Sequence, residues 1–163
     1  MRLVVADTSP IFYLLSIDQI DLLPQLFGTV FVPDAVFQEL THPAAPLALR
    51  SWAVQTPLWL QIATVRPLDD DSLSNLDAGE RAAITLALSM KADLLLIDER
   101  KGTRTALSKG LDVTGTLGIL RLAAMRGLVD PVDCFARLKL TSFRYRQETL
   151  DAILAEIGKP NDR

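Results

Sequence analysis

Short uninterrupted apolar runs recur along the chain and alternate with segments of helical periodicity. The clearest runs are Leu3–Ala6 and Leu94–Ile97, each followed at once by an aspartate. An apolar run of this length, bounded by turn residues, predicts a strand buried on both faces, as in a parallel sheet. Weaker patterns predict further strands at Thr29–Val32, Trp59–Val65 and Leu111–Thr114.

Apolar positions at helical spacing fill the intervals between these strands. Helices are predicted over Ser9–Ile17, from Asp18 or Asp21 to Gly28, and over Asp34–Leu40, Leu47–Val54, Asp77–Met90, Glu99–Lys109, Thr116–Arg126, Pro131–Leu140 and Gln147–Ile157. Ser9 is the predicted N-cap of the first helix, with Pro10 at its first helical position.

The alternation of strands and helices predicts an α/β fold. We expect a three-layer α/β/α sandwich with a four- or five-stranded, mainly parallel sheet. The 163 residues suit one domain over 1–163, with a core at about 3–128 and C-terminal helices at about 131–157. The acidic stretch Asp69–Ser72 is predicted to be a solvated turn.

The composition narrows the class of protein. Hydrophobic residues make up 49% of the chain and the mean hydropathy is +0.24, which argues against disorder. No stretch has the length and apolarity of a membrane span, and the N-terminus lacks the pattern of a signal peptide. Cys134 is the one cysteine, so no intramolecular disulfide forms. These features predict a cytoplasmic protein without a membrane partner.

The net charge of −3 conceals an uneven distribution. Residues 1–99 carry five Lys and Arg against thirteen Asp and Glu, whereas residues 100–146 carry ten against three. An acidic part joined to a basic part suits a metal site beside a surface that binds a polyanion. A solvated helix face explains the basic segment equally well.

Two carboxylates occupy equivalent places, because Asp7 and Asp98 each end a predicted buried strand. The carboxyl ends of parallel strands share one edge of a sheet, where ligands bind in open α/β folds. An aspartate at such a place can also cap the next helix. The repetition favours a site, with Asp7 and Asp98 within reach of one cation if their strands are neighbours.

Glu39 and Glu80 are weaker candidates. Asp77 and Glu80 have the spacing of a capping box, a local role as plausible as catalysis. Glu39 lies near the end of an amphipathic helix, where an acid is usually solvated. If all four acids converge, they cannot all stay ionised without a cation.

Oxygen ligands of this kind favour Mg²⁺ or Mn²⁺. Zinc is disfavoured, because His42 is the one histidine and Cys134 the one thiol. The same scarcity disfavours histidine-based catalysis. A metal–carboxylate site suits hydrolysis of a phosphodiester, because the ion activates water and neutralises phosphate charge.

Several neighbouring side chains could contact a phosphate. These candidates are hydroxyls at strand or helix ends and bases that follow Asp98, namely Thr8, Ser9, Thr116, Arg100, Lys101 and Arg104. A tight turn with Thr116 as the helix N-cap is the simpler interpretation of the segment G-T-L-G. Four aromatic residues are available for base stacking, although such residues more often pack in the core or against a partner, namely Trp52, Trp59, Phe143 and Tyr145.

Four segments together resemble the PIN-domain family. They are A-D-T-S-P, V-P-D-A-V-F-Q-E-L, L-D-A-G-E-R-A-A-I-T-L-A-L and L-L-L-I-D-E-R-K-G-T, in that order, within about Leu3–Leu128. The segments L-D-x-G-E and G-T-L-G are similar to those of a predicted nucleic-acid-binding branch of that family.

The resemblance implies a PIN fold with an acidic Mg²⁺ or Mn²⁺ pocket and ribonuclease activity on single-stranded RNA. Its four acids correspond here to Asp7, Glu39, Glu80 and Asp98, with Asp7, Glu80 and Asp98 as metal ligands. Many such proteins are dimeric toxins silenced by an antitoxin, so the resemblance also implies a homodimer and an antitoxin partner. The third acid of the family is commonly aspartate, and this chain exceeds the compact toxins at 41–76 and at the C-terminus.

Two other functions remain open. The chain could be a PIN-fold module that binds nucleic acid or a partner protein without turnover. The segment A-D-T-S also resembles haloacid-dehalogenase-type phosphatases, but those need a second aspartate where this chain has Ser9.

Overall fold

Five short parallel strands form the sheet of the residues that the computed structural model describes, 2–158. Their order across the sheet is β3-β2-β1-β4-β5, so β1 lies at the centre. The strands are β1 (Val4–Ala6), β2 (Val30–Pro33), β3 (Leu60–Ala63), β4 (Leu94–Leu96) and β5 (Val113–Thr114). The prediction of a parallel α/β sheet is confirmed, with five strands.

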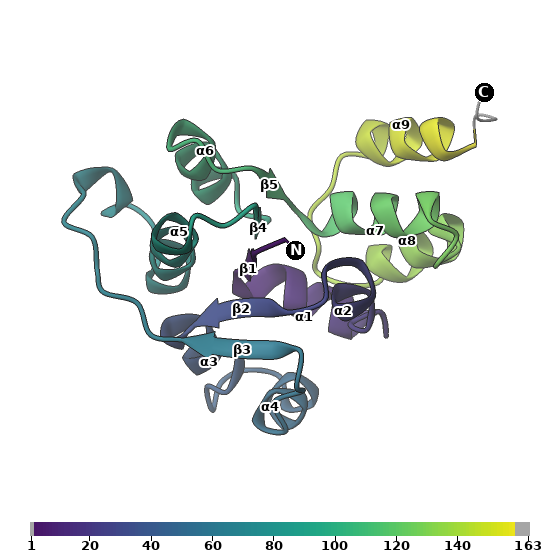
Figure 1. Cartoon of the computed structure of the whole chain (residues 1–163). Helices are drawn as coiled ribbons and strands as arrows, with labels where there is room; N and C mark the ends of the chain where they lie inside the picture. The colour runs from purple at the N-terminus through teal and green to yellow at the C-terminus, as the bar shows by residue number, and fades with distance from the viewer. Residues whose placement is uncertain (1, 159–163) are drawn as a thin grey trace.

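Helices cover both faces of this sheet (Figure 1). They are α1 (Thr8–Ser16), α2 (Leu22–Phe27), α3 (Asp34–Leu40), α4 (Leu47–Val54), α5 (Ala78–Met90), α6 (Arg100–Ser108), α7 (Thr116–Met125), α8 (Pro131–Lys139) and α9 (Gln147–Ile157), with a 3₁₀ turn η1 (Asp71–Leu73) before α5. Helix α5 packs across β1, β2 and β4, and α6 packs on β5. Helices α1, α2 and α7 pack together on the other side, which makes three layers. None of the helices in residues 2–158 is both long and apolar enough to span a bilayer.

The central strands are apolar because both of their faces are covered. All three residues of β1 and all three of β4 are buried. The core continues into α8 and α9, where Phe135, Leu138 and Leu150 are at most 2% exposed. The C-terminal helices are therefore packed onto the same core as the sheet.

The helix boundaries mostly follow the local signals. Helices α3, α4 and α9 have the predicted ranges, and α2 begins after Asp21 and ends at Gly28, whose φ is +72°. The predicted cap of α1 is wrong. Asp7 is its N-cap residue and Thr8 its first residue, so Pro10 lies in the third helical position. Proline is tolerated there because the first-turn N–H groups have no partner within the helix.

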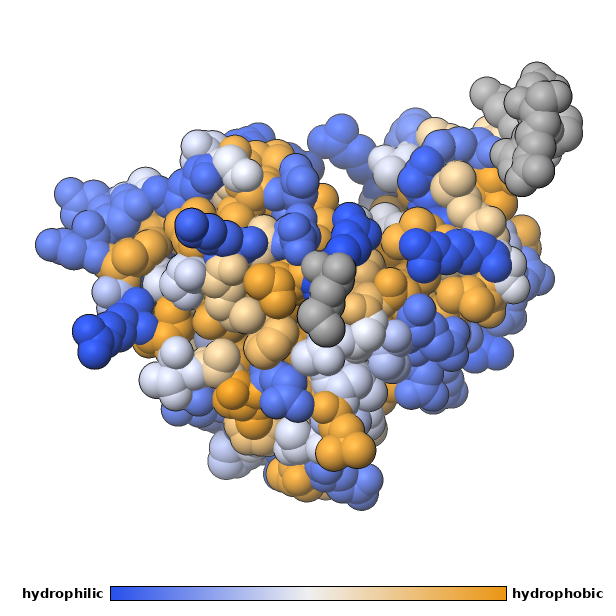
Figure 2. Space-filling model, viewed as in Figure 1, coloured by the Kyte–Doolittle hydropathy of each residue, from blue (hydrophilic) through white to orange (hydrophobic). Residues whose placement is uncertain are grey.

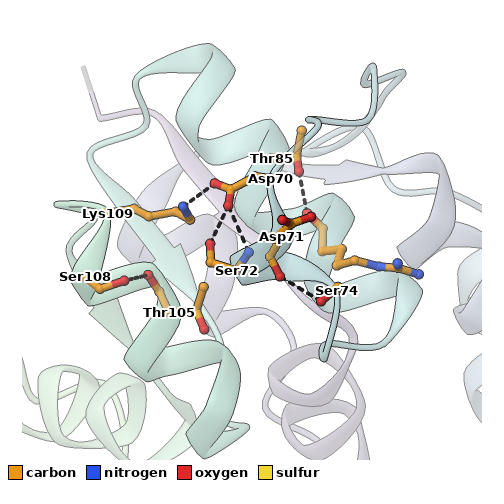
Figure 3. A network of polar contacts seen from close by, with 9 residues as sticks. Asp70, Asp71, Ser72, Ser74, Thr85, Thr105, Ser108 and Lys109 are labelled. Carbon is orange, nitrogen blue, oxygen red and sulfur yellow. Dashed lines mark hydrogen bonds and ion pairs between the residues drawn. The ribbon is translucent and has the colours of Figure 1, made fainter.

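The acidic turn before α5 has a structural role (Figure 3). Asp70 accepts hydrogen bonds from the Ser72 backbone N–H at 3.0 Å and the Ser72 hydroxyl at 2.6 Å, and it forms an ion pair with Lys109. Lys109 and these hydrogen bonds lower the pKa of Asp70 to about 2. The Asp70–Lys109 ion pair therefore connects the β3–α5 loop to the C-terminal end of α6.

Candidate active site

Strand register brings the two predicted strand-end aspartates to one edge of the sheet. Strands β1 and β4 are parallel neighbours with Ala6 opposite Leu96, and the Asp7 backbone N–H donates to the Leu96 carbonyl at 2.9 Å. Asp7 and Asp98 therefore follow adjacent strands. The edge is completed by α3, which follows β2 directly, and by the N-terminal turn of α5.

Asp7 is buried among other carboxylates. It is 4% exposed, and its pKa is raised to about 7, first because burial disfavours the charged form. The negative charges of Glu39, Asp77 and Glu80 raise the pKa further, whereas the Thr8 backbone N–H favours the ionised form. Although Asp7 occupies the N-cap position of α1, its side chain makes no capping hydrogen bond. The Asp7 carboxylate therefore does not act as the capping acceptor of α1.

The Glu39 carboxylate lies near Asp7 and is contacted by Thr8 and Gly79. The Thr8 hydroxyl donates a hydrogen bond to Glu39 Oε2. The Glu39 carboxylate also lies against Gly79 in the first turn of α5, where a Cβ atom would come within 2.7 Å of Glu39 Cδ. Glycine in the L-D-A-G-E segment thus makes room for this carboxylate.

Glu80 takes part in the predicted capping box. Its backbone N–H donates to Asp77 Oδ1 at 2.8 Å, and its own Oε2 accepts from the Asp77 backbone N–H at 3.3 Å. The side chain is buried, and burial followed by the charge of Asp77 raises the pKa of Glu80 to about 7. Glu80 thus has a local structural role and also lies close enough to Asp7 to affect it.

Asp98 is held by α7. Its Oδ1 accepts from the Thr116 backbone N–H and its Oδ2 from the Thr116 hydroxyl, both at 2.7 Å. Burial raises the pKa of Asp98, and the two hydrogen bonds oppose that rise. The interpretation of Thr116 as an N-cap is wrong. Gly115 is the N-cap residue, Thr116 is the first residue of the helix, and the capping acceptor comes from Asp98.

The structure thus groups Asp7, Glu39 and Glu80 with Asp77 and ties Asp98 to Thr116. Within residues 2–158, no three His, Cys, Asp or Glu side chains are placed so as to hold a metal ion as they stand. The set of metal ligands therefore stays a prediction.

The donor set nevertheless fits a hard divalent cation. Asp7 and Glu80 are buried carboxylates whose pKa values are raised, and the ion pairs in the described part of the chain use other acids. A cation placed between such groups would relieve the cost of ionising them. The softer ligands lie elsewhere, since exposed His42 accepts from the Ala44 backbone N–H and Cys134 is buried in α8.

The predicted phosphate-binding residues divide into two groups. Thr8 and Thr116 position carboxylates, and Ser9 lies half-buried in the first turn of α1. Arg100, Lys101 and Arg104 are exposed on α6. Of these three bases, Arg100 lines a cavity of about 540 Å³ together with Asp98.

Three further candidate residues were not predicted from the sequence. Asp77 contributes charge near Asp7, although its spacing indicated a cap alone. Arg144 and Arg146 line the cavity that contains Asp98 and Arg100. The basic excess of residues 100–146 was the one signal that pointed to them.

A second cavity of about 610 Å³ lies between α3, α5 and the acidic turn. Asp34, Asp69, Asp70 and Asp71 line it together with Arg81. Asp70 is already engaged by Lys109 and Ser72. This cavity does not include any of the four predicted catalytic acids.

Comparison with known proteins agrees with this architecture. A family model described as a PIN domain matches residues 3–159, nearly the whole chain. PIN domains are generally nucleases and typically use divalent metal ions. No curated protein matches the chain significantly. On the strength of the family match and the five-stranded parallel sheet, this chain belongs to the PIN-domain family.

Proposed function

We propose that the protein is a metal-dependent endoribonuclease that hydrolyses phosphodiester bonds of single-stranded RNA. The observation that carries the proposal is the cluster of Asp7, Glu39 and Glu80 at the carboxyl edge of the parallel sheet. The raised pKa values of Asp7 and Glu80 mean that this cluster gains most from a bound cation at neutral pH and above.

Asp7, Glu80 and Asp98 would hold Mg²⁺ or Mn²⁺, which when bound lowers the pKa of a water molecule and neutralises charge on the phosphate. Glu39, which accepts a hydrogen bond from the Thr8 hydroxyl, would act beside Asp7 as an orienting acid. Thr116 fixes the direction of the Asp98 carboxylate. Ser9, Arg100, Lys101 and Arg104 would contact the phosphate backbone.

The test is cleavage of a single-stranded RNA by the purified protein with Mg²⁺ or Mn²⁺, beside Asp7→Asn. Asp112→Asn is a matched control, because Asp112 is exposed in the loop before β5. We expect cleavage by the wild type and by Asp112→Asn, and none by Asp7→Asn. Cleavage that is absent from the wild type, or equal in all three proteins, contradicts the proposal.

A second function is favoured by a specific observation, namely that the Glu80 and Asp98 carboxylates already accept backbone N–H groups at the beginnings of α5 and α7. Acids retained for capping would preserve the fold in a module that binds nucleic acid or a partner protein without turnover. Such a module would retain single-stranded RNA in EDTA and show no cleavage with either metal.

We further propose that the protein acts in the cytoplasm as the toxin of a toxin–antitoxin pair, as a homodimer silenced by an antitoxin. Membership of the PIN-domain family, in which many proteins are dimeric toxins silenced by an antitoxin, supports this role. Expression of the wild type should then arrest growth of a bacterial host, and expression of Asp7→Asn should not. Equal growth of the two strains contradicts the toxin role.

A further inference from the structure

We propose that the segment Phe143–Arg146, between α8 and α9, forms the strand-binding wall of the site. In this assignment, Arg100, Arg144 and Arg146 contact the phosphates of a single-stranded polynucleotide and Tyr145 stacks on one of its bases. The inference rests on the proposed nuclease function, since it concerns the substrate of the same site.

The cavity beside Asp98 brings these residues together from distant parts of the chain. Asp98 and Arg100 come from the β4–α6 junction, Gly115 and Gly118 from the start of α7, and residues 143–146 from the α8–α9 connection. In Figure 2 the surface is notched between α6 and α9, and hydrophilic side chains stand on both sides of the notch. The cavity therefore opens to solvent directly beside a predicted catalytic acid.

The charge of the lining favours a polyanion. Three arginines face a single acid, Asp98, although the whole chain has a net charge of −3. Within residues 2–158, Arg100, Arg144 and Arg146 take part in no ion pair. All three arginines are exposed, so they are available to phosphates without breaking an existing ion pair.

The wall is attached firmly to the helix that follows Asp7. Phe143 packs edge-to-face on Tyr13 of α1, with ring centroids 4.9 Å apart, and the Tyr13 hydroxyl lies 3.1 Å from Ser142 Oγ. Phe143 therefore anchors the segment. Tyr145, by contrast, is 37% exposed and lines the cavity, so its ring is accessible to a base.

A single strand fits this lining better than a duplex or a protein. An exposed aromatic side chain flanked by arginines offers a stacking surface together with phosphate contacts, and the bases of a duplex are already stacked on one another. An acidic peptide would use the arginines but gain nothing specific from the tyrosine ring.

The experiment measures binding of a fluorescein-labelled 12-nucleotide single-stranded RNA in EDTA by fluorescence anisotropy, at several salt concentrations. The variants are Arg144→Gln/Arg146→Gln and Tyr145→Leu. Arg126→Gln is the control, because Arg126 is also exposed but lies at the other end of α7 and outside the cavity. Thermal denaturation of each variant checks that it is folded.

We expect the double arginine variant to bind at least tenfold more weakly. Its slope of log K against log salt should fall by roughly 1.4, since each phosphate contact to a single strand contributes about 0.7. Tyr145→Leu should weaken binding about tenfold through lost stacking. Arg126→Gln should bind like the wild type.

Unchanged affinity in the folded double variant overturns the inference, and so does a wild type that binds no RNA. Displacement of the RNA by poly-glutamate at equal charge concentration also overturns it, because that result assigns the cavity to an acidic peptide. A wild type that binds RNA through these residues but cleaves none contradicts the proposed nuclease function and supports the wall.

Discussion

Both carboxylate oxygens of Asp98 are engaged by one residue, Thr116, through its backbone N–H and its hydroxyl at 2.7 Å each. This pair joins the end of β4 to the beginning of α7. Two hydrogen bonds from one residue restrict the Asp98 carboxylate to one orientation. Thr116 therefore fixes the direction in which this carboxylate can contact a ligand.

Replacement of Thr116 by valine should destabilise the protein by about 1–3 kcal/mol, since a buried acceptor loses its partner. The hydroxyl opposes the burial-induced rise in the pKa of Asp98, so its loss raises that pKa further. In the folded state the Asp98 carboxyl then keeps its proton to a higher pH. The loss of stability caused by the substitution therefore grows from acid to neutral pH. Urea unfolding at both pH values measures it. Thr116→Ser keeps the hydroxyl and should behave like the wild type, and equal stability of the valine variant would refute this role.

Asp7→Asn should make the metal-free protein more stable at neutral pH and above. The folded pKa of Asp7 is about 7, against 3.8 for the free side chain. Below pH 3.8 the Asp7 carboxyl is protonated in both the folded and the unfolded state. Between pH 3.8 and about pH 7 it ionises in the unfolded state but stays protonated in the folded state. Wild-type stability therefore falls across this window, by an amount on the order of a few kcal/mol.

Chemical denaturation from pH 4 to pH 8 in EDTA tests this relationship. The difference between Asp7→Asn and the wild type should be small at pH 4 and largest at pH 8. Asp112→Asn, which removes an exposed charge, should show no such trend. A variant that is less stable than the wild type at pH 8 means that Asp7 is structural.

Mn²⁺ should raise the Tm of the wild type, and more at pH 8 than at pH 5.5. Binding to Asp7 and Glu80 requires their ionised forms, whose populations grow as the pH passes about 7. At a metal concentration one hundred times Kd, the stabilisation is about 2.7 kcal/mol. EDTA should reverse the shift, and Asp7→Asn should abolish it. An equal shift in Asp7→Asn places the ion elsewhere.

Gly79→Ala should interact energetically with Glu39→Ala. Alanine is favoured over glycine within a helix by about 1 kcal/mol, but a Cβ at position 79 displaces the Glu39 carboxylate and its hydrogen bond from Thr8. In the Glu39→Ala background that conflict is absent, so Gly79→Ala should stabilise. A double-mutant cycle should give a coupling of about 1 kcal/mol. Additive effects would show that position 79 has room for a methyl group.

Much of the fold was predictable, because its signals are local. The buried strands at β1 and β4 are continuous apolar runs, and the capping box at Asp77 and Glu80 is a spacing of three residues. Helices α3, α4 and α9 follow from periodicity and turn residues. The cap of α1 was misplaced, because a strand-end aspartate and a nearby serine offer the same chemistry and only backbone dihedrals distinguish them.

The sequence by itself determined that two aspartates each follow a buried strand and that the available donors are oxygens. The tertiary structure alone decided how the carboxylates are used. Packing of α3 against α5 brought Glu39 to Gly79, and the placement of α7 turned Asp98 toward Thr116. It also carried Arg144 and Arg146 to the cavity beside Asp98. Side-chain direction and distant contacts depend on how the helices pack on the sheet, and no short stretch of sequence contains that information.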